Sequence, residues 1–350
     1  MVYPNSESGR QNTRRARHFT TSKKKNFLSH VRQLNIENRL YRTPAQRSRI
    51  DFDKLLQRII FALPENHLTC FQSDTHISPH LIRCLFLTQN ALQELSFNGL
   101  TLAEDPGTRI SLTEVAAYVT PALLNVKKLT ISIKHWDCNT YEDSAQLITN
   151  TPNLEFLHLN SKLSRVIHIN KRLGRDALGG PHAPGQKPKK LIEFHLEYIN
   201  CGEVPASLLE FNDYSVLRVL SITRCHGLNH FFNGLTTKFV RACALISLNI
   251  ILPSPVIWEV FDPEIVEQLL NSITSPLRSI ELDMGMNKMV HVSCITKHGP
   301  SLESLTLTAT QRGQESCVPL NYICDITESA PHLKDFKIGS RYYLKSTWWH

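Results

Sequence analysis

Apolar residues recur along the chain in triplets that occupy the first, fourth and sixth positions of a short segment. The clearest triplet is Leu217, Leu220 and Ile222, and Cys225 follows it at the ninth position. Residues two apart in a β-strand point to the same side, so Leu220 and Ile222 predict a strand with one buried face. Leu217 extends the same apolar layer into the turn before the strand.

Ten more segments repeat this spacing. Nine carry the full apolar triplet, and their first positions are Val31, Leu92, Val126, Leu154, Leu191, Leu245, Leu277, Leu302 and Leu333. The tenth, at Leu68 and Phe71, has Ser73 at its sixth position. Successive fourth positions lie 24 to 37 residues apart, which leaves room for a return segment of variable length. One such unit cannot bury its apolar side alone, so the units must stack.

This spacing is the signature of leucine-rich repeats. It predicts an α/β fold, a right-handed leucine-rich-repeat solenoid shaped like the horseshoe of ribonuclease inhibitor. A parallel sheet would line the concave face and helices the convex face. We expect the solenoid to span residues 26–345. Only Cys225 places Cys or Asn at the ninth position, so the other segments depart from the signature there.

Helical periodicity falls between the triplets, in six segments. They are 50–62, 78–90, 111–124, 232–244, 263–274 and 317–329. In 263–274, Asp262 is a good N-cap and Pro263 suits the first helical position. An apolar stripe then runs from Ile265 to Ile273. A capping-box pattern, Ser111 with Glu114, opens the segment 111–124.

Two stretches interrupt the rhythm. Residues 1–25 hold seven Lys or Arg and one acidic residue, and we expect a disordered basic tail. Three readings of Arg14–Lys25 stay open: a solvated tail, a nuclear-import or acidic-partner segment, and a mitochondrial presequence. Residues 170–190 are rich in Gly, Pro and Lys and predict an inserted surface loop.

Composition narrows the class of protein. With 41% hydrophobic and 20% charged residues, the chain resembles soluble folded proteins. It has no apolar run long enough to span a membrane and no secretory signal, so we expect no membrane association. Nine scattered Cys without a C-x-x-C pair favour reduced thiols and a cytoplasmic or nuclear location. The net charge of +8 sits mainly in the tail, which argues against a nucleic-acid partner.

The sequence holds few groups that suggest chemistry. Neither H-E-x-x-H, G-x-S-x-G nor a phosphate-binding loop is present. The pairs His76 with His80 and His226 with His230 are spaced for metal binding, and Cys225 adjoins the second, but zinc needs three or four ligands. We therefore predict a protein that is not an enzyme, with no catalytic residue, no metal and no cofactor.

The strand alternation identifies a candidate binding surface. Third, fifth and seventh positions of each repeat point away from the core, and several there are aromatic, apolar or acidic. We predict that a protein partner binds Phe156, His158, Glu193, His195, Glu197, Val219, Glu281 and Asp283. Phe156 and Val219 are apolar where solvent is expected, and the acidic positions favour a partner with a basic or mixed surface. The alternative is a solvated face with no partner.

The repeats from Val31 to Ile338 resemble the leucine-rich-repeat domains of F-box proteins, especially divergent fungal ones. The resemblance implies a substrate receptor of a ubiquitin ligase, bound to the cullin–RING enzyme through an adaptor if an F-box is supplied. Leu63–Leu68 matches the F-box opening L-P-x-x-x-L, but the strand expected at Leu92 leaves no room for the rest of that module. The alternative function is a free-standing leucine-rich-repeat inhibitor or adaptor unrelated to ubiquitin ligases.

Overall fold

The computed structural model describes most of the predicted repeats. The described residues are 28, 30–37, 46–75, 77–98, 121–133, 147–148, 150–161, 190–199, 201, 213–240, 243–252, 262–284, 289–309 and 318–340. The predicted tail 1–25, the loop 170–190 apart from its last residue and the capping box at Ser111 lie outside them. The chain divides into two compact units, residues 1–128 with 146–152 and residues 129–145 with 153–350, and each is described by itself.

All eleven predicted triplets coincide with β-strands. The strands are β1 Gln33–Ile36, β2 Cys70–Ser73, β3 Glu94–Asn98, β4 Lys128–Ile133, β5 Phe156–Ser161, β6 Glu193–Glu197, β7 Val219–Thr223, β8 Ser247–Ile251, β9 Ser279–Asp283, β10 Ser304–Ala309 and β11 Asp335–Ser340. In each, the fourth and sixth triplet positions fall inside the strand and the first lies just before it. The predicted spacing and strand positions are therefore confirmed.

In the first unit, β1, β2 and β3 are adjacent and parallel, with Leu34 opposite Phe71 and Phe71 opposite Leu95. The return segments are the helices α3 Gln46–Ala62 and α4 Pro79–Thr88. The side chain of Ser78 caps α4 by accepting a hydrogen bond from the Leu81 amide. Ser73 fills an apolar position because its buried hydroxyl bonds to Thr75, which satisfies the polar group.

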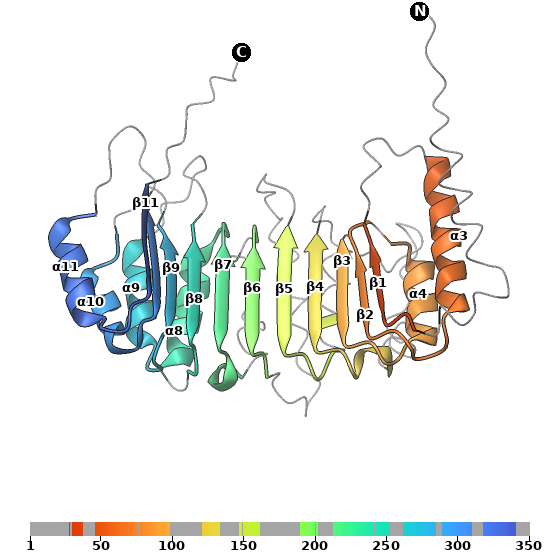
Figure 1. Ribbon diagram of the computed structural model, residues 1–350, viewed down its shortest axis with the longest axis horizontal. Helices are drawn as coiled ribbons and strands as arrows, with labels where there is room; N and C mark the ends of the chain where they lie inside the picture. The colour runs from red at the N-terminus through yellow and green to blue at the C-terminus, as the bar shows by residue number, and fades with distance from the viewer. Residues whose placement is uncertain are drawn as a thin grey trace, which may run out of the picture. The chain divides into compact units, whose positions relative to one another are not determined.

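In the second unit, β4 to β11 follow one another in the sheet in sequence order, and the printed pairings from β5 to β11 are all parallel. The helices α8 Leu228–Phe239, α9 Pro263–Ser272, α10 Val292–Thr296 and α11 Leu320–Ser329 lie on one side of this sheet (Figure 1). The described parts of the connections also include two 3-10 turns, η3 Tyr214–Val216 and η4 Gly299–Ser301. These stacked strand-and-return units form a leucine-rich-repeat solenoid, as the triplets predicted.

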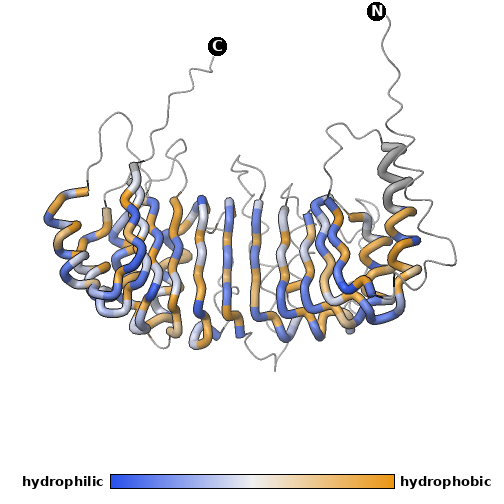
Figure 2. Tube along the Cα trace, in the orientation of Figure 1, coloured by the Kyte–Doolittle hydropathy of each residue, from blue (hydrophilic) through white to orange (hydrophobic). Residues whose placement is uncertain are grey.

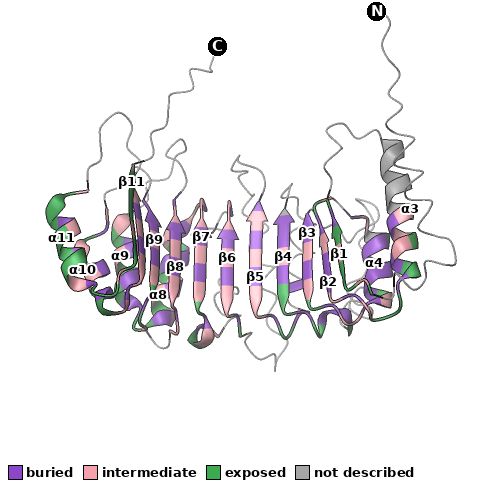
Figure 3. Ribbon diagram, in the orientation of Figure 1, coloured by how far each residue is buried: buried purple, intermediate pink, exposed green. Residues whose placement is uncertain are grey.

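The core lies between the strands and the helices. Hydrophobic and polar residues alternate along most strands (Figure 2), and in β5 to β8 buried residues alternate with partly exposed ones (Figure 3). Stacking extends the apolar side from strand to strand, because Leu220 lies opposite Phe194 on one side and Leu248 on the other. All three are buried. Within the described residues, no helix combines the length and apolar character needed to cross a bilayer.

Helix ends follow the predicted signals to different degrees. Helix α9 begins at Pro263, and Asp262 accepts a hydrogen bond from the Glu264 amide, as predicted. Helix α8 begins at Leu228, four residues before the predicted start. Gly227 makes this possible, because its φ of 65° turns the chain directly from the strand into the helix. The short helix α10 was not predicted, since five residues are too few to show a helical period.

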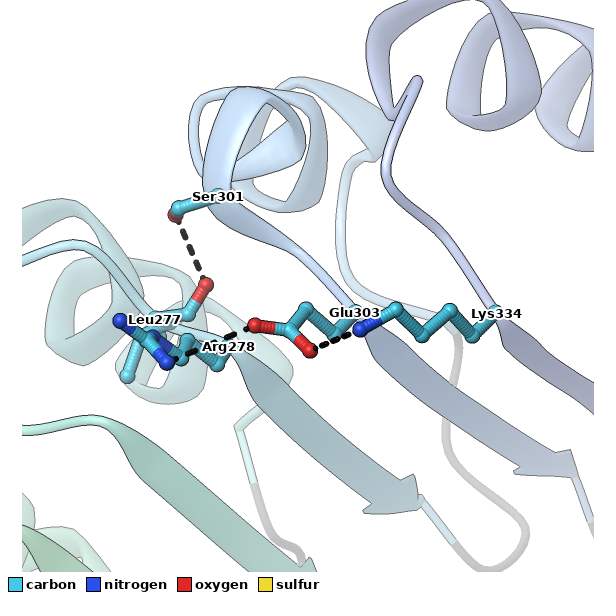
Figure 4. Close-up of polar contacts among 5 residues, drawn as sticks. All are labelled: Leu277, Arg278, Ser301, Glu303 and Lys334. Atoms are coloured by element: carbon cyan, nitrogen blue, oxygen red, sulfur yellow. Dashed lines mark hydrogen bonds and ion pairs between the residues drawn. The ribbon is translucent and has the colours of Figure 1, made fainter.

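The residues just before β9, β10 and β11 form an exposed charged row. Glu303 contacts Arg278 at 3.6 Å and Lys334 at 2.7 Å (Figure 4). The hydrogen bond from Lys334 is the main cause that lowers the pKa of Glu303 below its ordinary value. Ser301 donates to the Leu277 carbonyl at 2.8 Å in the same region. Successive repeats are thus joined at the strand starts by side chains as well as by the sheet.

Candidate functional site

The outward side chains of β5 to β11 form three parallel rows, which we call the free face. In the third-position row lie Phe156, Glu193, Val219, Ser247, Ser279, Ser304 and Asp335. In the fifth-position row lie His158, His195, Ser221, Asn249, Glu281, Thr306 and Lys337. In the seventh-position row lie Asn160, Glu197, Thr223, Ile251, Asp283, Thr308 and Gly339.

All eight predicted binding residues belong to these rows. Seven of them are partly exposed, while Asp283 is only 6% exposed. The five on β5 and β6 come together, and Val219 lies opposite Glu193 on the next strand. Glu281 and Asp283 stand apart on β9, because β7 and β8 lie between. The predicted surface thus has one compact group and one separate acidic strand.

The compact group is Phe156, His158, Asn160, Glu193, His195 and Glu197, which we call the His–Glu cluster. The imidazole ring of His195 lies between two other rings. Its centroid is 5.1 Å from that of Phe156, with the planes tilted by 37°. It is 5.8 Å from that of His158, in an edge-to-face arrangement at 62°. Three rings from two neighbouring strands therefore make a continuous aromatic surface.

Two carboxylates flank these rings on β6. Glu193 Oε2 lies 3.4 Å from His195 Nε2, and Glu197 Oε2 lies 3.6 Å from His158 Nε2. Glu197 also accepts a hydrogen bond of 2.7 Å from Asn160 Nδ2. Each histidine thus contacts a different glutamate, and Asn160 holds the second glutamate in place.

Burial lowers the pKa of His158 below its ordinary value, and the neighbouring His195 lowers it further. Glu197 acts in the opposite direction, but its effect is smaller. The neutral imidazole is therefore the form that this environment favours at neutral pH. A neutral His158 does not balance the negative charge of Glu197.

The charge of the free face differs from that of the whole chain. Its outward positions from β5 to β10 hold four carboxylates, those of Glu193, Glu197, Glu281 and Asp283, and neither Lys nor Arg. The chain as a whole carries a net charge of +8. The first outward cation is Lys337, on β11. The face is therefore acidic within a basic protein.

Two asparagines of the free face were not among the predicted residues. In the described part of the molecule, Asn160 Oδ1 and Asn249 Oδ1 are buried and accept no hydrogen bond. The strand alternation places both residues outward, so their position on the free face could have been predicted from the sequence. It could not show that the amide oxygens would lack donors, because this depends on packing between strands.

A second polar feature lies where β6 and β7 end. Tyr198 and Arg224 have backbone φ values of 55° and 53°, in the left-handed region that residues other than glycine rarely adopt. The Arg224 guanidinium lies 5.5 Å from the centre of the Tyr198 ring and donates a hydrogen bond to its hydroxyl. Neither residue is marked by a sequence motif, so the prediction missed this contact.

The described residues include no group of three or more His, Cys, Asp and Glu side chains arranged to hold a metal ion. His76 lies outside the described residues, whereas His80 contacts Gln57 at 3.0 Å. Cys225 is buried, and its thiol contacts the Thr223 carbonyl at 3.5 Å. Cys225 therefore closes the turn after β7.

No family model matches this sequence, and no curated protein matches it. Among solved structures, the chain is similar to the leucine-rich repeat-containing protein LegL7 from Legionella pneumophila. The sequences are 11% identical, the TM-score is 0.41, and the match covers 89% of this chain and 84% of the other. The assignment of the fold rests on the repeats themselves.

Proposed function

We propose that this protein is a non-enzymatic scaffold that binds a protein partner on its free face. The observation that supports this most is the His–Glu cluster. It combines an apolar ring, two imidazoles and two carboxylates on adjacent strands, at positions that simple strand alternation assigns to solvent. Aromatic residues with polar neighbours are typical of the energetically important parts of protein interfaces.

The shape of the surface also supports the proposal. Neighbouring strands lie about 4.8 Å apart, so β5 to β10 present a face about 24 Å wide. That width suits a protein segment or domain surface, and it is wider than most small ligands need. Around the cluster, the serines at 247, 279 and 304 in the third-position row leave the face open, because their side chains are small.

The F-box resemblance supplies a finer proposal, in which the bound protein is the substrate of a cullin–RING ubiquitin ligase. The segment Leu63–Leu68 is used differently here, because it connects α3 to β2. Leu63 and Leu68 are buried, and Asn66 adopts a φ of 56° in the turn. An F-box would therefore have to come from another segment. A free-standing inhibitor or adaptor, independent of ubiquitin ligases, is the competing proposal.

A bulky, uncharged substitution on the free face tests the main proposal. Ser221 lies between His195 and Asn249, so Ser221→Tyr would cover the face without altering its charge. We expect the full chain to retain a stoichiometric partner in affinity purification with mass spectrometry. The Ser221→Tyr variant should lose that partner.

The matched control is Thr237→Tyr, on the exposed side of α8. This variant introduces the same bulky side chain on the helical layer, and it should still bind the partner. Circular dichroism would show that both variants are folded. A partner that survives Ser221→Tyr, or is lost equally in Thr237→Tyr, would contradict binding at the free face. A cullin subunit in the wild-type complex would favour the ubiquitin-ligase proposal over the inhibitor.

A further inference from the structure

We propose that the partner segment bound at the free face is basic and extended, and that one of its arginine side chains lies over the Phe156 and His195 rings beside Glu193. This inference rests on the proposed function and specifies the chemistry of the partner. Three features of the second unit support it: the charge of the face, the ring surface and the accessible carboxylates.

The charge of the face selects the sign of the partner. The outward positions of β5 to β10 hold three partly exposed carboxylates, those of Glu193, Glu197 and Glu281, and neither Lys nor Arg, which favours a negative potential along these strands. Charge complementarity speeds association and disfavours acidic partners. A basic segment is therefore the occupant that this surface attracts.

The accessible carboxylates of the face, Glu193 and Glu197, are acceptors that a donor-rich partner can satisfy. Carboxylates accept hydrogen bonds and cannot donate them. A partner segment that brings many N–H donors therefore matches these two glutamates better than one that brings more acceptors. Arginine carries five such donors in a planar group.

The rings favour arginine over lysine. A planar guanidinium stacks on aromatic faces and forms two hydrogen bonds with a carboxylate, whereas an ammonium group acts as a compact charge. Phe156 lies opposite Glu193 in the strand register, and its ring contacts that of His195. An apolar ring and a carboxylate therefore lie side by side, which is the pair of contacts that a guanidinium can make together.

The carboxylates remain available to a ligand. The side chain of Glu193 is 43% exposed, and that of Glu197 is 32% exposed. A carboxylate offers about four acceptor positions. Glu193 makes one contact within the cluster and Glu197 makes two. Each glutamate can thus accept further hydrogen bonds without losing its present ones.

The two carboxylates also set the form of the segment. They are four residues apart on one strand, which separates them by about 13 Å. One cationic side chain cannot reach both, whereas an extended segment places alternate side chains about 7 Å apart on the same side. A segment of about nine residues, with several arginines, could contact Glu193, Glu197 and the acidic strand β9.

Fluorescence anisotropy with labelled nonapeptides would test this inference on the full chain. The probes are a Gly/Ser peptide with three Arg, the same peptide with three Lys, and the same with three Glu. We expect the affinity order Arg, Lys, Glu. The double variant Glu193→Gln with Glu197→Gln should weaken binding of the Arg peptide about tenfold or more, as two lost charged contacts imply.

The matched control is Asp325→Asn with Glu328→Gln, which removes the same charge from the exposed surface of α11. It should change the affinity less than about twofold, because distant exposed charges are screened by salt. Phe156→Ala should reduce the preference for Arg over Lys. Failure of the Arg peptide to bind, equal binding of the Glu peptide, or equal losses in the two double variants would overturn the inference.

The outcomes also separate this inference from the proposed function. If Ser221→Tyr removes the natural partner but the Arg peptide does not bind, the scaffold function holds and the basic partner is wrong. If Ser221→Tyr has no effect on the natural partner, the free face is not its binding surface. In that case any peptide binding reflects charge alone.

Discussion

Strands β8 and β11 carry the same apolar pattern, yet they differ greatly in burial. In β8, the sixth-position residue Ile250 is fully buried, at 0% exposure. In β11, the equivalent residue Ile338 is 42% exposed. Strand β8 lies between β7 and β9, whereas β11 pairs with β10 alone. In the described residues, β8 is followed by the helix α9 and β11 by no further element. An apolar position in a repeat is therefore buried by the neighbouring repeats, because a single unit cannot cover it.

The largest loss of stability is expected for a substitution at the buried Ile250. Ile250→Ala should lower the free energy of unfolding by about 2–5 kcal/mol, because it removes three buried carbon atoms and leaves a cavity. Denaturation by urea, followed by circular dichroism, would measure the loss. An effect below about 1 kcal/mol would mean that the layer between β8 and its helices is loosely packed.

Tyr322→Phe should have the next largest effect. Helix α11 is the last described helix, and the buried Tyr322 hydroxyl donates a 3.0 Å hydrogen bond to the Val290 carbonyl, just before α10. Removing it leaves that carbonyl without this donor, at a cost of about 1–3 kcal/mol. The same urea titration would measure the change. A variant as stable as the wild type would show that water replaces the hydroxyl and that the end of the solenoid is open to solvent.

A smaller, pH-dependent effect is expected at His298, which lies between the interior repeats and the end. Its ring is buried and contacts the Leu270 carbonyl at 3.2 Å, and burial lowers its pKa below the ordinary 6.5. The unfolded chain therefore binds the proton more readily. The stability that His298 contributes is present above about pH 6.5 and is lost as the pH falls toward the lower pKa of the folded state.

Unfolding free energies measured between pH 7.5 and 5 would test this sign. His298→Gln keeps a hydrogen-bond donor but cannot titrate, so the loss of stability at low pH should be smaller in the variant. The slope should not vanish, because burial also lowers the pKa of His158. An unchanged slope would show that His298 is accessible to water in the folded protein.

How much the sequence could predict depended on the range of the interactions involved. The period-two pattern placed every described strand, because alternation is a local property that stacking reinforces. It also located α9, where Asp262 and Pro263 supply strong starting signals. It misplaced the start of α8, because Gly227 allows a sharp turn that periodicity cannot reveal. It missed α10, which is too short to show a period.

The candidate site was predictable in part for the same reason. Alternation put Phe156, His158, Glu193, His195 and Glu197 on one surface, and the register shows that they meet. It also assigned Asp283 to that surface, although this side chain is nearly covered in the structure. Contacts between strands decide burial at the ends of strands, and a single sequence does not contain them. The partner role of these residues stays a prediction.

The smallest loss of stability is expected for a substitution at the exposed Ile338. Ile338→Ala removes the same atoms as Ile250→Ala, from the same position of the repeat, but at a site already open to solvent. Little apolar area is lost from the core, so we expect a change of about 0.5 kcal/mol or less. If Ile338→Ala instead costs as much as Ile250→Ala, then β11 is covered in solution by something beyond its own repeat. Analytical ultracentrifugation of the wild type would then distinguish a second copy of the chain from a segment of the same chain. The ratio of the two alanine effects thus measures how far a solenoid repeat depends on what lies next to it.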